Sequence, residues 1–133
     1  MPAIRTKCVW TPMNRERDGL RILVTRYIPR ACPGTRYNVW MANLGPSERL
    51  LKGYQAGRID WDEFSRRYEK ELFQEAPVDR HNPRIKNYGQ KFTLRLLREL
   101  ARRQPITLMC NCAEDEHHCQ RHLLKGILES SRI

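Results

Sequence analysis

The stretch that decides the fold is residues 20–27, LRILVTRY, because its apolar side chains fall on both sides of a strand. Successive side chains of a β-strand point to opposite faces, so Leu20, Ile22 and Val24 share one face and Leu23 lies on the other. Apolar residues on both faces are typical of a strand in a covered parallel sheet. The stretch therefore predicts a central strand of an α/β domain.

The rest of the chain alternates between strand patterns and helix patterns. Strand patterns cover residues 4–10 and 106–109, a turn is expected over residues 14–19, and helix patterns cover residues 46–55, 61–73, 87–104 and 117–129. Asp60 is expected to cap the helix that starts at Trp61. Strands separated by helices predict one small α/β domain over residues 1–133. Its central, mostly parallel sheet would be flanked by helices in a Rossmann-like or flavodoxin-like layering.

Two proline-bearing, arginine-rich loops, residues 28–45 and 76–86, interrupt this alternation. Loops as long as the first are usually functional when they occur in a compact domain. Tyr37 and Trp40 in the first loop could equally plug a small satellite core beneath a surface excursion. The sequence leaves both interpretations open.

The charge of the chain points toward anionic partners. It has 25 Lys and Arg residues against 15 Asp and Glu residues, a formal net charge of +10. Arginine side chains suit phosphate and carboxylate groups, so a phosphorylated small molecule or a nucleic acid is the expected partner. An idle basic surface would have the same composition. Charge alone therefore names a class of partner and no particular molecule.

Hydropathy and cysteine usage indicate the compartment. No window approaches the roughly 20 apolar residues of a membrane span, and the first ten residues lack the apolar core of a signal peptide. Five cysteines, an odd number, argue against a disulfide framework. We expect a cytoplasmic protein with reduced thiols and no membrane partner. The sequence gives no indication of its oligomeric state.

Residues 107–124, TLMCNCAEDEHHCQRHLL, concentrate three of the five cysteines and three of the four histidines. One interpretation is a zinc site with Cys110, Cys112, Cys119 and His122 as ligands. The spacing is unlike the usual pairs of zinc ligands, and helical periodicity turns His122 away from the buried helix face. No cofactor is therefore favoured, and zinc is kept as the alternative.

A second interpretation of this segment is a reactive thiol. Cys119, near the start of the last helix and beside Arg121, is a candidate nucleophile, and Cys110 at the strand end is another. The two histidines before Cys119 could act as bases. The acidic residues 114–116 oppose thiolate formation. Catalysis by Cys119 or Cys110, in a hydrolase or transferase step, is therefore a hypothesis that the sequence leaves open.

A third interpretation is a ligand site that the fold itself builds. In open α/β sheets, ligands bind at the carboxyl ends of strands and against helix N-termini. If LRILVTRY adjoins the last strand, Arg26, Tyr27 and Arg30 would meet Gln120 and Arg121 in one crevice. An anionic ligand, a nucleotide or a nucleic-acid phosphate, is its natural occupant. The alternative is a non-enzymatic, zinc- or redox-linked protein that interacts with nucleic acid through its basic surface.

Three stretches carry a resemblance: RILVTRYIPR, LGPSERLLKGYQAGRIDWDEFSRRYEKEL and TLMCNCAEDEHHCQRHLL. Together they resemble the domain-of-unknown-function family 488. Its members have RILVTRYWPRG, a LAPS-like helix start, a W-x-x-F-x-x-x-Y-x-x-E-L helix, and a final strand that leads through an acidic loop to Cys-His-Arg. The likeness spans nearly the whole chain in the same order and spacing. It implies a small α/β fold and a set of site positions, and it names no reaction.

The resemblance places eight residues of this chain at family positions: Arg26, Pro29, Arg30, Pro46, Ser47, Cys110, Cys119 and Arg121. The sequence departs from the family at Ile28, where tryptophan is usual, at Ala31, where glycine is usual, and at Gln120, where histidine is usual. Glutamine donates and accepts hydrogen bonds but does not transfer protons. The change at Gln120 therefore suits a binding role better than an acid or base role.

Overall fold

A computed structural model describes residues 4–74 and 89–133 of the chain. The predicted loop over residues 76–86 lies outside these ranges. The elements in chain order are β1 (Ile4–Cys8), α1 (Arg15–Asp18), β2 (Leu20–Leu23), η1 (Gly34–Arg36), β3 (Val39–Trp40), η2 (Ala42–Leu44), α2 (Glu48–Gln55), α3 (Trp61–Leu72), α4 (Lys91–Arg103), β4 (Ile106–Cys110) and α5 (Gln120–Glu129).

The strands form one sheet in the order β1-β4-β2-β3, and every pairing in it is parallel. β4 is central, with Cys8 opposite Cys110 on one side and Leu23 opposite Met109 on the other. The adjacency of β2 and β4, on which the predicted crevice depends, is therefore present. This all-parallel sheet with its helices confirms the predicted α/β class. The carboxyl ends of all four strands lie along one edge of the sheet.

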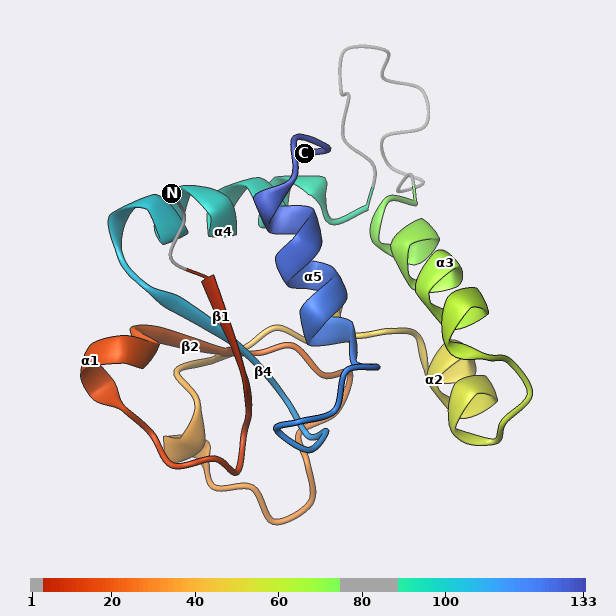
Figure 1. Ribbon diagram of the computed structural model, residues 1–133, viewed down its shortest axis with the longest axis horizontal. Helices are drawn as coiled ribbons and strands as arrows, with labels where there is room; N and C mark the ends of the chain where they lie inside the picture. The colour runs from red at the N-terminus through yellow and green to blue at the C-terminus, as the bar shows by residue number, and fades with distance from the viewer. Residues whose placement is uncertain (1–3, 75–88) are drawn as a thin grey trace.

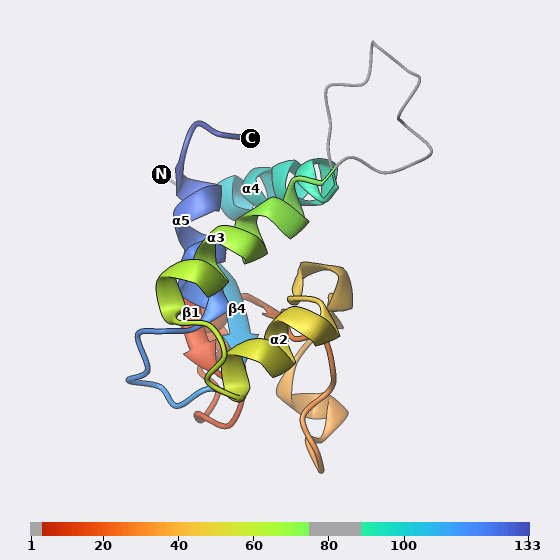
Figure 2. The same ribbon diagram turned by 90° about the vertical axis from the view of Figure 1, so that its right-hand side faces the viewer.

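Most of the core lies on one face of the sheet. Ile22 and Val24 of the β2 segment and Leu108 of β4 pack there against helices α2 to α5. Figure 1 shows α5 lying across β1 and β4, with α4 at the amino ends of the strands, and Figure 2 shows α2 packed beneath α3. The other face carries a smaller cluster of Val9, Leu23 and Met109 under Cys32 and Tyr37. The satellite core, one of the two interpretations of the first long loop, is thus present; it contains Tyr37, while Trp40 is exposed.

Two helices begin where their sequences indicate. The Asp60 side chain accepts a hydrogen bond from the Glu63 backbone N–H at 2.8 Å, which confirms the predicted cap of α3. Ser47 caps α2 in the same way through the Leu50 N–H. Behind its cap, α3 buries Phe64, the next residue along its predicted apolar stripe after Trp61.

Three local predictions differ from the structure. The expected turn over residues 14–19 contains the single helical turn α1, because the Asn14 side chain caps the Arg17 N–H. The long loop contains the short edge strand β3, which two residues are too few to signal by alternation. The last helix begins at Gln120, three residues later than expected, because residues 111–119 fold back over the end of β4. Because α5 starts late, Cys110 and Cys119 lie next to each other, with the buried Arg121 in contact with Cys110.

None of the helices in the described part of the chain combines the length and the apolar character that a bilayer-spanning helix needs.

Candidate functional site

Three cysteines meet at the carboxyl end of the central strand and form what we call the thiol cluster: Cys110, Cys112 and Cys119. Their sulfur atoms all lie within 4.8 Å of one another. Cys110 is the last residue of β4, Cys112 follows in the turn, and Cys119 is the residue that precedes the first turn of α5. The cluster thus forms because the chain leaves the strand after Cys110 and, after eight intervening residues, returns to the same point at Cys119.

The sulfurs of Cys110 and Cys119 lie 2.8 Å apart, and both residues are buried. The Cys110 sulfur also accepts a hydrogen bond from the backbone N–H of Cys112 at 3.2 Å. Cys112 itself is half-buried, whereas Cys110 and Cys119 are at most 1% exposed. Within the cluster, Cys112 therefore offers the thiol that a molecule from solvent can reach.

Arg121 contacts the cluster from the interior of the protein and has no exposed surface. Its Nη1 donates to the Cys110 sulfur at 3.0 Å and to the Cys112 carbonyl at 3.2 Å. Its Nη2 donates to the carbonyls of Ala113 and Glu114 at 2.8 and 3.1 Å. These four hydrogen bonds hold the turn that follows β4 around the guanidinium group. A buried cation of this kind needs a compensating charge close by.

The thiol cluster supplies that charge as one shared thiolate. Hydrogen bonds from Cys110 and then Cys119, with the positive charge of Arg121, lower the pKa of Cys112 to about 3. The same hydrogen bond raises the pKa of Cys110 to about 12, and hydrogen bonding to Cys110 and Cys112 raises the pKa of Cys119 as well. The cluster therefore shares one negative charge close to Arg121, which donates to the Cys110 sulfur, and Cys112 is the member whose pKa is lowered.

A cavity of about 290 Å³ opens beside the cluster at the carboxyl ends of β2 and β4; we call it the strand-end cavity. Its wall comes from the segment after β2, from α2, from the turn after β4 and from the start of α5. The lining residues are Thr25, Arg26, Tyr27, Pro29, Pro46, Leu51, Gln55, Cys110, Asn111, Cys112 and Gln120. The cavity is therefore the place where a ligand could touch the Cys112 sulfur.

The structure brings most of the predicted site residues to this place, in different roles. Arg26 and Tyr27 line the cavity, as does Gln120, whose Oε1 lies 3.5 Å from the Cys119 sulfur. Arg26 Nε and Nη2 donate to the carbonyls of Pro46 and Gly45 at 2.9 and 2.8 Å, so this side chain also ties the end of β2 to the start of α2. Arg121 lies behind the cluster and is not part of the cavity wall.

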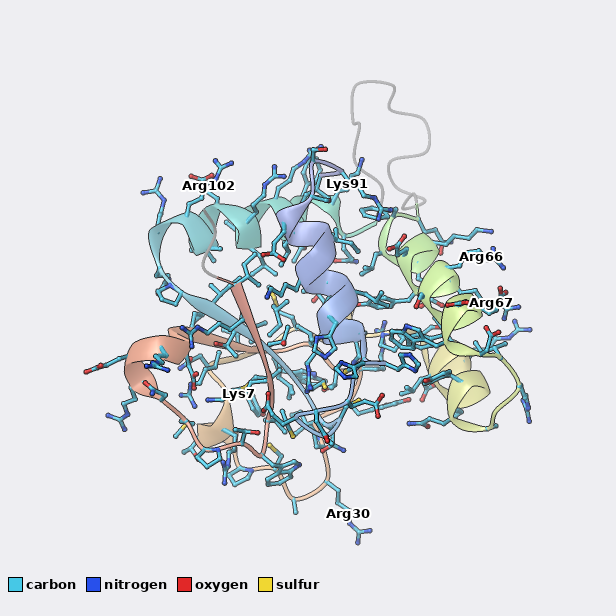
Figure 3. The ribbon with its side chains drawn as sticks, in the orientation of Figure 1. Lys7, Arg30, Arg66, Arg67, Lys91 and Arg102 are labelled. Atoms are coloured by element: carbon cyan, nitrogen blue, oxygen red, sulfur yellow. The ribbon has the colours of Figure 1, made fainter. Side chains whose placement is uncertain are left out.

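Other predicted residues lie apart from the cavity. Arg30 is exposed and extends outward from its loop, as Figure 3 shows. His122 Nε2 is 2.9 Å from the Glu116 carbonyl oxygen, and His122 is not among the residues of the thiol cluster.

The two histidines that were candidate bases also lie outside the cavity. His117 and His118 precede α5 and are exposed, and the ring of His118 stacks on the ring of Trp61 with a centroid distance of 4.9 Å. No imidazole among the described residues lines the cavity.

Sequence reasoning missed the contributions of α2 and of Asn111. Leu51 and Gln55 reach the cavity because α2 packs beside the β2–β4 ends, which no local pattern reveals. The sequence also did not predict that Cys112 is the most exposed of the three cysteines, because strand alternation and helical periodicity give no information about the exposure of a residue in a turn. One signal did exist: Pro46, a family position, lies against the end of β2.

Comparison with known proteins identifies the family of the chain. Searches of curated proteins and of solved structures gave no match to the chain. The family model described as "Active DUF488-N3 subclade" matches residues 4–132, which include every described element and the whole strand-end site. The chain therefore belongs to the DUF488-N3a family, as its three sequence motifs indicated.

Proposed function

We propose that this protein is a thiol-dependent enzyme that binds an anionic substrate in the strand-end cavity. One observation carries the proposal: Cys112, the half-buried member of the thiol cluster, is also a residue of the cavity wall. A thiolate, and not a thiol, is the nucleophilic form of cysteine. A group with its charge already in place and its sulfur facing a cavity is suited to attack a bound substrate.

The proposed step is nucleophilic substitution at an acyl or phosphoryl centre. The Cys112 sulfur forms a bond to the electrophilic carbon or phosphorus, and the leaving group departs with the electron pair of its own bond. Water or a second substrate then takes the group from the sulfur in a hydrolase or transferase reaction. Cys110 and Cys119, whose sulfurs lie within 4.8 Å of the Cys112 sulfur, and the guanidinium of Arg121 set the electrostatic surroundings of the thiolate. This assignment moves the nucleophile from Cys119 or Cys110 to Cys112.

Arg26 supports an anionic substrate. Two of its three guanidinium nitrogens are fixed on carbonyls, and the third, Nη1, has no hydrogen-bond partner among the described residues. A guanidinium held in place on two sides loses little side-chain entropy when it binds an oxyanion. The positive end of α5 begins at Gln120 on the same cavity wall and favours negative charge there.

Aromatic side chains around the cavity support a substrate with a planar ring, such as a nucleotide or a nucleic-acid end. Tyr27 lines the cavity with 48% of its surface exposed. The indole nitrogens of Trp10 and Trp40 donate to the lining residues Asn111 and Thr25, both at 2.8 Å. Exposed aromatic faces fixed beside a basic group are typical of sites that stack bases. The word "Active" in the family description is consistent with catalysis.

Ligand protection of Cys112 tests this proposal. We expect iodoacetamide to alkylate Cys112 faster than Cys32, a half-buried thiol outside the cavity, in the reduced protein. AMP or inorganic phosphate should slow alkylation at Cys112 and leave Cys32 unchanged. Tyr27→Ala should weaken protection by AMP more than protection by phosphate. Equal reaction rates at the two cysteines, with no protection by any phosphate compound, would contradict the proposal.

A second candidate function is metal binding, and the three convergent sulfurs favour it. Cys110, Cys112 and Cys119 offer three thiolates, a donor set that zinc accepts, and a fourth position would remain open toward the cavity. Three thiolates and a divalent cation carry one net negative charge, which Arg121 would balance. The buried Nε–H of Arg121 has no hydrogen-bond partner among the described residues. A negatively charged metal–thiolate group near Arg121 would offer this N–H a favourable electrostatic interaction.

Metal content of the untagged protein distinguishes the two candidates. One zinc ion per chain, lost in Cys112→Ser and Cys119→Ser but retained in the control Cys32→Ser, would establish the metal site. Metal-free protein that retains the fast alkylation of Cys112 would favour the nucleophile. His122→Ala should leave the metal content unchanged, because His122 is not part of the cluster.

A further inference from the structure

The geometry points to a redox activity of the thiol cluster: we infer that Cys112 reduces hydroperoxides and that the cluster stores the oxidation as a Cys110–Cys119 disulfide. The inference shares its thiolate with the proposed function but needs no anionic substrate. It starts from the number of thiols in the cluster. Nucleophilic catalysis needs a single thiol, but two more lie within 4.8 Å of the Cys112 sulfur. An oxidised cysteine of the cluster therefore has a neighbouring thiol with which it can form a disulfide.

In the first step the Cys112 thiolate attacks the outer oxygen of the hydroperoxide. The S–O bond forms as the O–O bond breaks, and the departing alkoxide or hydroxide takes a proton from solvent. Cys112 becomes a sulfenic acid and the hydroperoxide becomes an alcohol or water. Cysteines that solvent can reach are the ones most prone to this oxidation, and Cys112 is the half-buried member of the cluster and lines the strand-end cavity.

In the second step the Cys119 sulfur attacks the Cys112 sulfenic acid. A disulfide forms between them, and the hydroxide that leaves combines with the Cys119 proton as water. Two thiols have then lost two electrons and two protons to one hydroperoxide. Cys119 is the suitable partner because it comes from another element, whereas Cys110 and Cys112 are separated by one residue on the same turn.

In the third step Cys110 attacks the Cys119 sulfur and releases Cys112 as a thiolate. The sulfurs of Cys110 and Cys119 lie 2.8 Å apart, so closing them to the roughly 2.05 Å of a disulfide requires a small movement. The Cys110 proton passes to the departing Cys112 sulfur and from there to solvent as the Cys112 thiolate forms again. Exchange of this kind needs no external oxidant, and a dithiol reductant would reset the cluster.

The surrounding structure tolerates the oxidised state. Arg121 loses a thiol partner when Cys110 is oxidised but keeps its bonds to the carbonyls of Cys112, Ala113 and Glu114. The turn therefore stays wrapped around the guanidinium. The new disulfide would be buried between β4 and α5, out of reach of bulky reductants, while Cys112 remains in the cavity wall.

Stoichiometric oxidation followed by mass spectrometry tests the inference. One equivalent of hydrogen peroxide should remove two hydrogens from the intact mass, peptide mapping should locate a Cys110–Cys119 disulfide, and Cys112 should still react with iodoacetamide. Cys112→Ser should lose two hydrogens at least about tenfold more slowly, because the attacking thiolate is absent. Cys32→Ser, the matched control, should oxidise at the rate of the natural chain.

A trapping experiment examines the intermediate. In Cys119→Ser, dimedone should label Cys112 after addition of peroxide; if this variant does not fold, dimedone added together with peroxide to the natural chain should compete with disulfide formation. A disulfide at any other pair, stepwise addition of oxygen without a disulfide, or unchanged oxidation in Cys112→Ser would overturn the inference. Protection of Cys112 by AMP would still stand in those cases, so the two proposals fail separately.

Discussion

The guanidinium Nη1 of Arg121 lies 3.0 Å from the sulfur of Cys110 in the interior of the protein. This contact joins the first turn of α5 to the end of β4, and it accounts for the charge of the thiol cluster. An arginine cannot lose its proton in a protein, so burying it requires an anion or a set of oriented carbonyls. Here three carbonyls and a thiolate cluster share that task, which couples the stability of the fold to the chemistry of the site.

Replacing Arg121 should therefore reduce both stability and thiol reactivity. Arg121→Lys keeps the charge but cannot reach one sulfur and three carbonyls with a single ammonium, and we expect a loss of about 3 kcal/mol in the free energy of unfolding. Urea denaturation measures the loss, and alkylation of Cys112 should slow in the folded variant. Arg102→Lys, at an exposed ion pair with Glu99 on α4, should change stability by less than about 0.5 kcal/mol. Similar losses in the two variants would show that the buried contacts contribute little.

The reactivity of Cys112 should depend only weakly on pH. Because hydrogen bonds lower the pKa of Cys112 to about 3, its thiolate is fully formed by roughly pH 5, and its alkylation rate should stay nearly constant up to about pH 8. Burial raises the pKa of Cys32, so its rate should rise with every pH unit across the same range. Stopped alkylation and peptide mapping give both rates in one sample. A Cys112 rate that climbs in parallel with that of Cys32 would contradict an ionised cluster.

The close approach of Gly45 to the end of β2 should be intolerant of a side chain. A Cβ at Gly45 would lie 2.4 Å from the backbone nitrogen of Arg26, and neither backbone can move without shifting the cavity wall. We expect Gly45→Ala to cost about 2 kcal/mol in the free energy of unfolding. Gly53→Ala in α2 is the matched control: a Cβ there meets nothing within 4 Å and should stabilise the helix by about 0.5–1 kcal/mol. A thermal melt of each variant checks the opposite signs.

The buried carboxylate of Asp18 should make stability fall at acid pH. Burial by itself would raise its pKa, but hydrogen bonds from the Asn14 N–H and from Lys7 outweigh burial and lower it. A lowered folded-state pKa contributes stability above the unfolded value of about 3.9, and this contribution disappears as the pH falls through the folded-state pKa. Denaturation at pH values from about 6 down to 2 should show the loss in the natural chain and a smaller one in Asp18→Asn. The exposed Asp62→Asn should retain the full dependence.

Local sequence patterns determined much of the fold. The two-sided apolar pattern of LRILVTRY identified β2, the spacing of Phe64 and its neighbours identified α3, and Asp60 identified where that helix begins. These features are local because they arise from side-chain periods of two and 3.6 residues and from a single capping bond. The prediction of a site at the ends of β2 and β4 also followed, since parallel strands end at a common edge.

What each site residue does depended on contacts between distant segments. The sequence predicted Arg121 in the crevice, but α5 begins at Gln120 and the preceding turn folds over the guanidinium, so Arg121 is completely buried. The exposure of Cys112 likewise follows from the path of that turn. The sequence predicted Arg26 only as a residue of the crevice, whereas two of its guanidinium nitrogens donate to carbonyls next to α2.

The sequence by itself thus determined most of the elements, their class and the edge of the sheet where chemistry-bearing residues gather. Tertiary structure alone decided which cysteines line the cavity, which arginine is buried against them and which arginine lies in the cavity wall. The physical reason is the same in each case. Periodicity is a property of one segment, whereas burial and hydrogen bonding depend on what another segment brings to the same place.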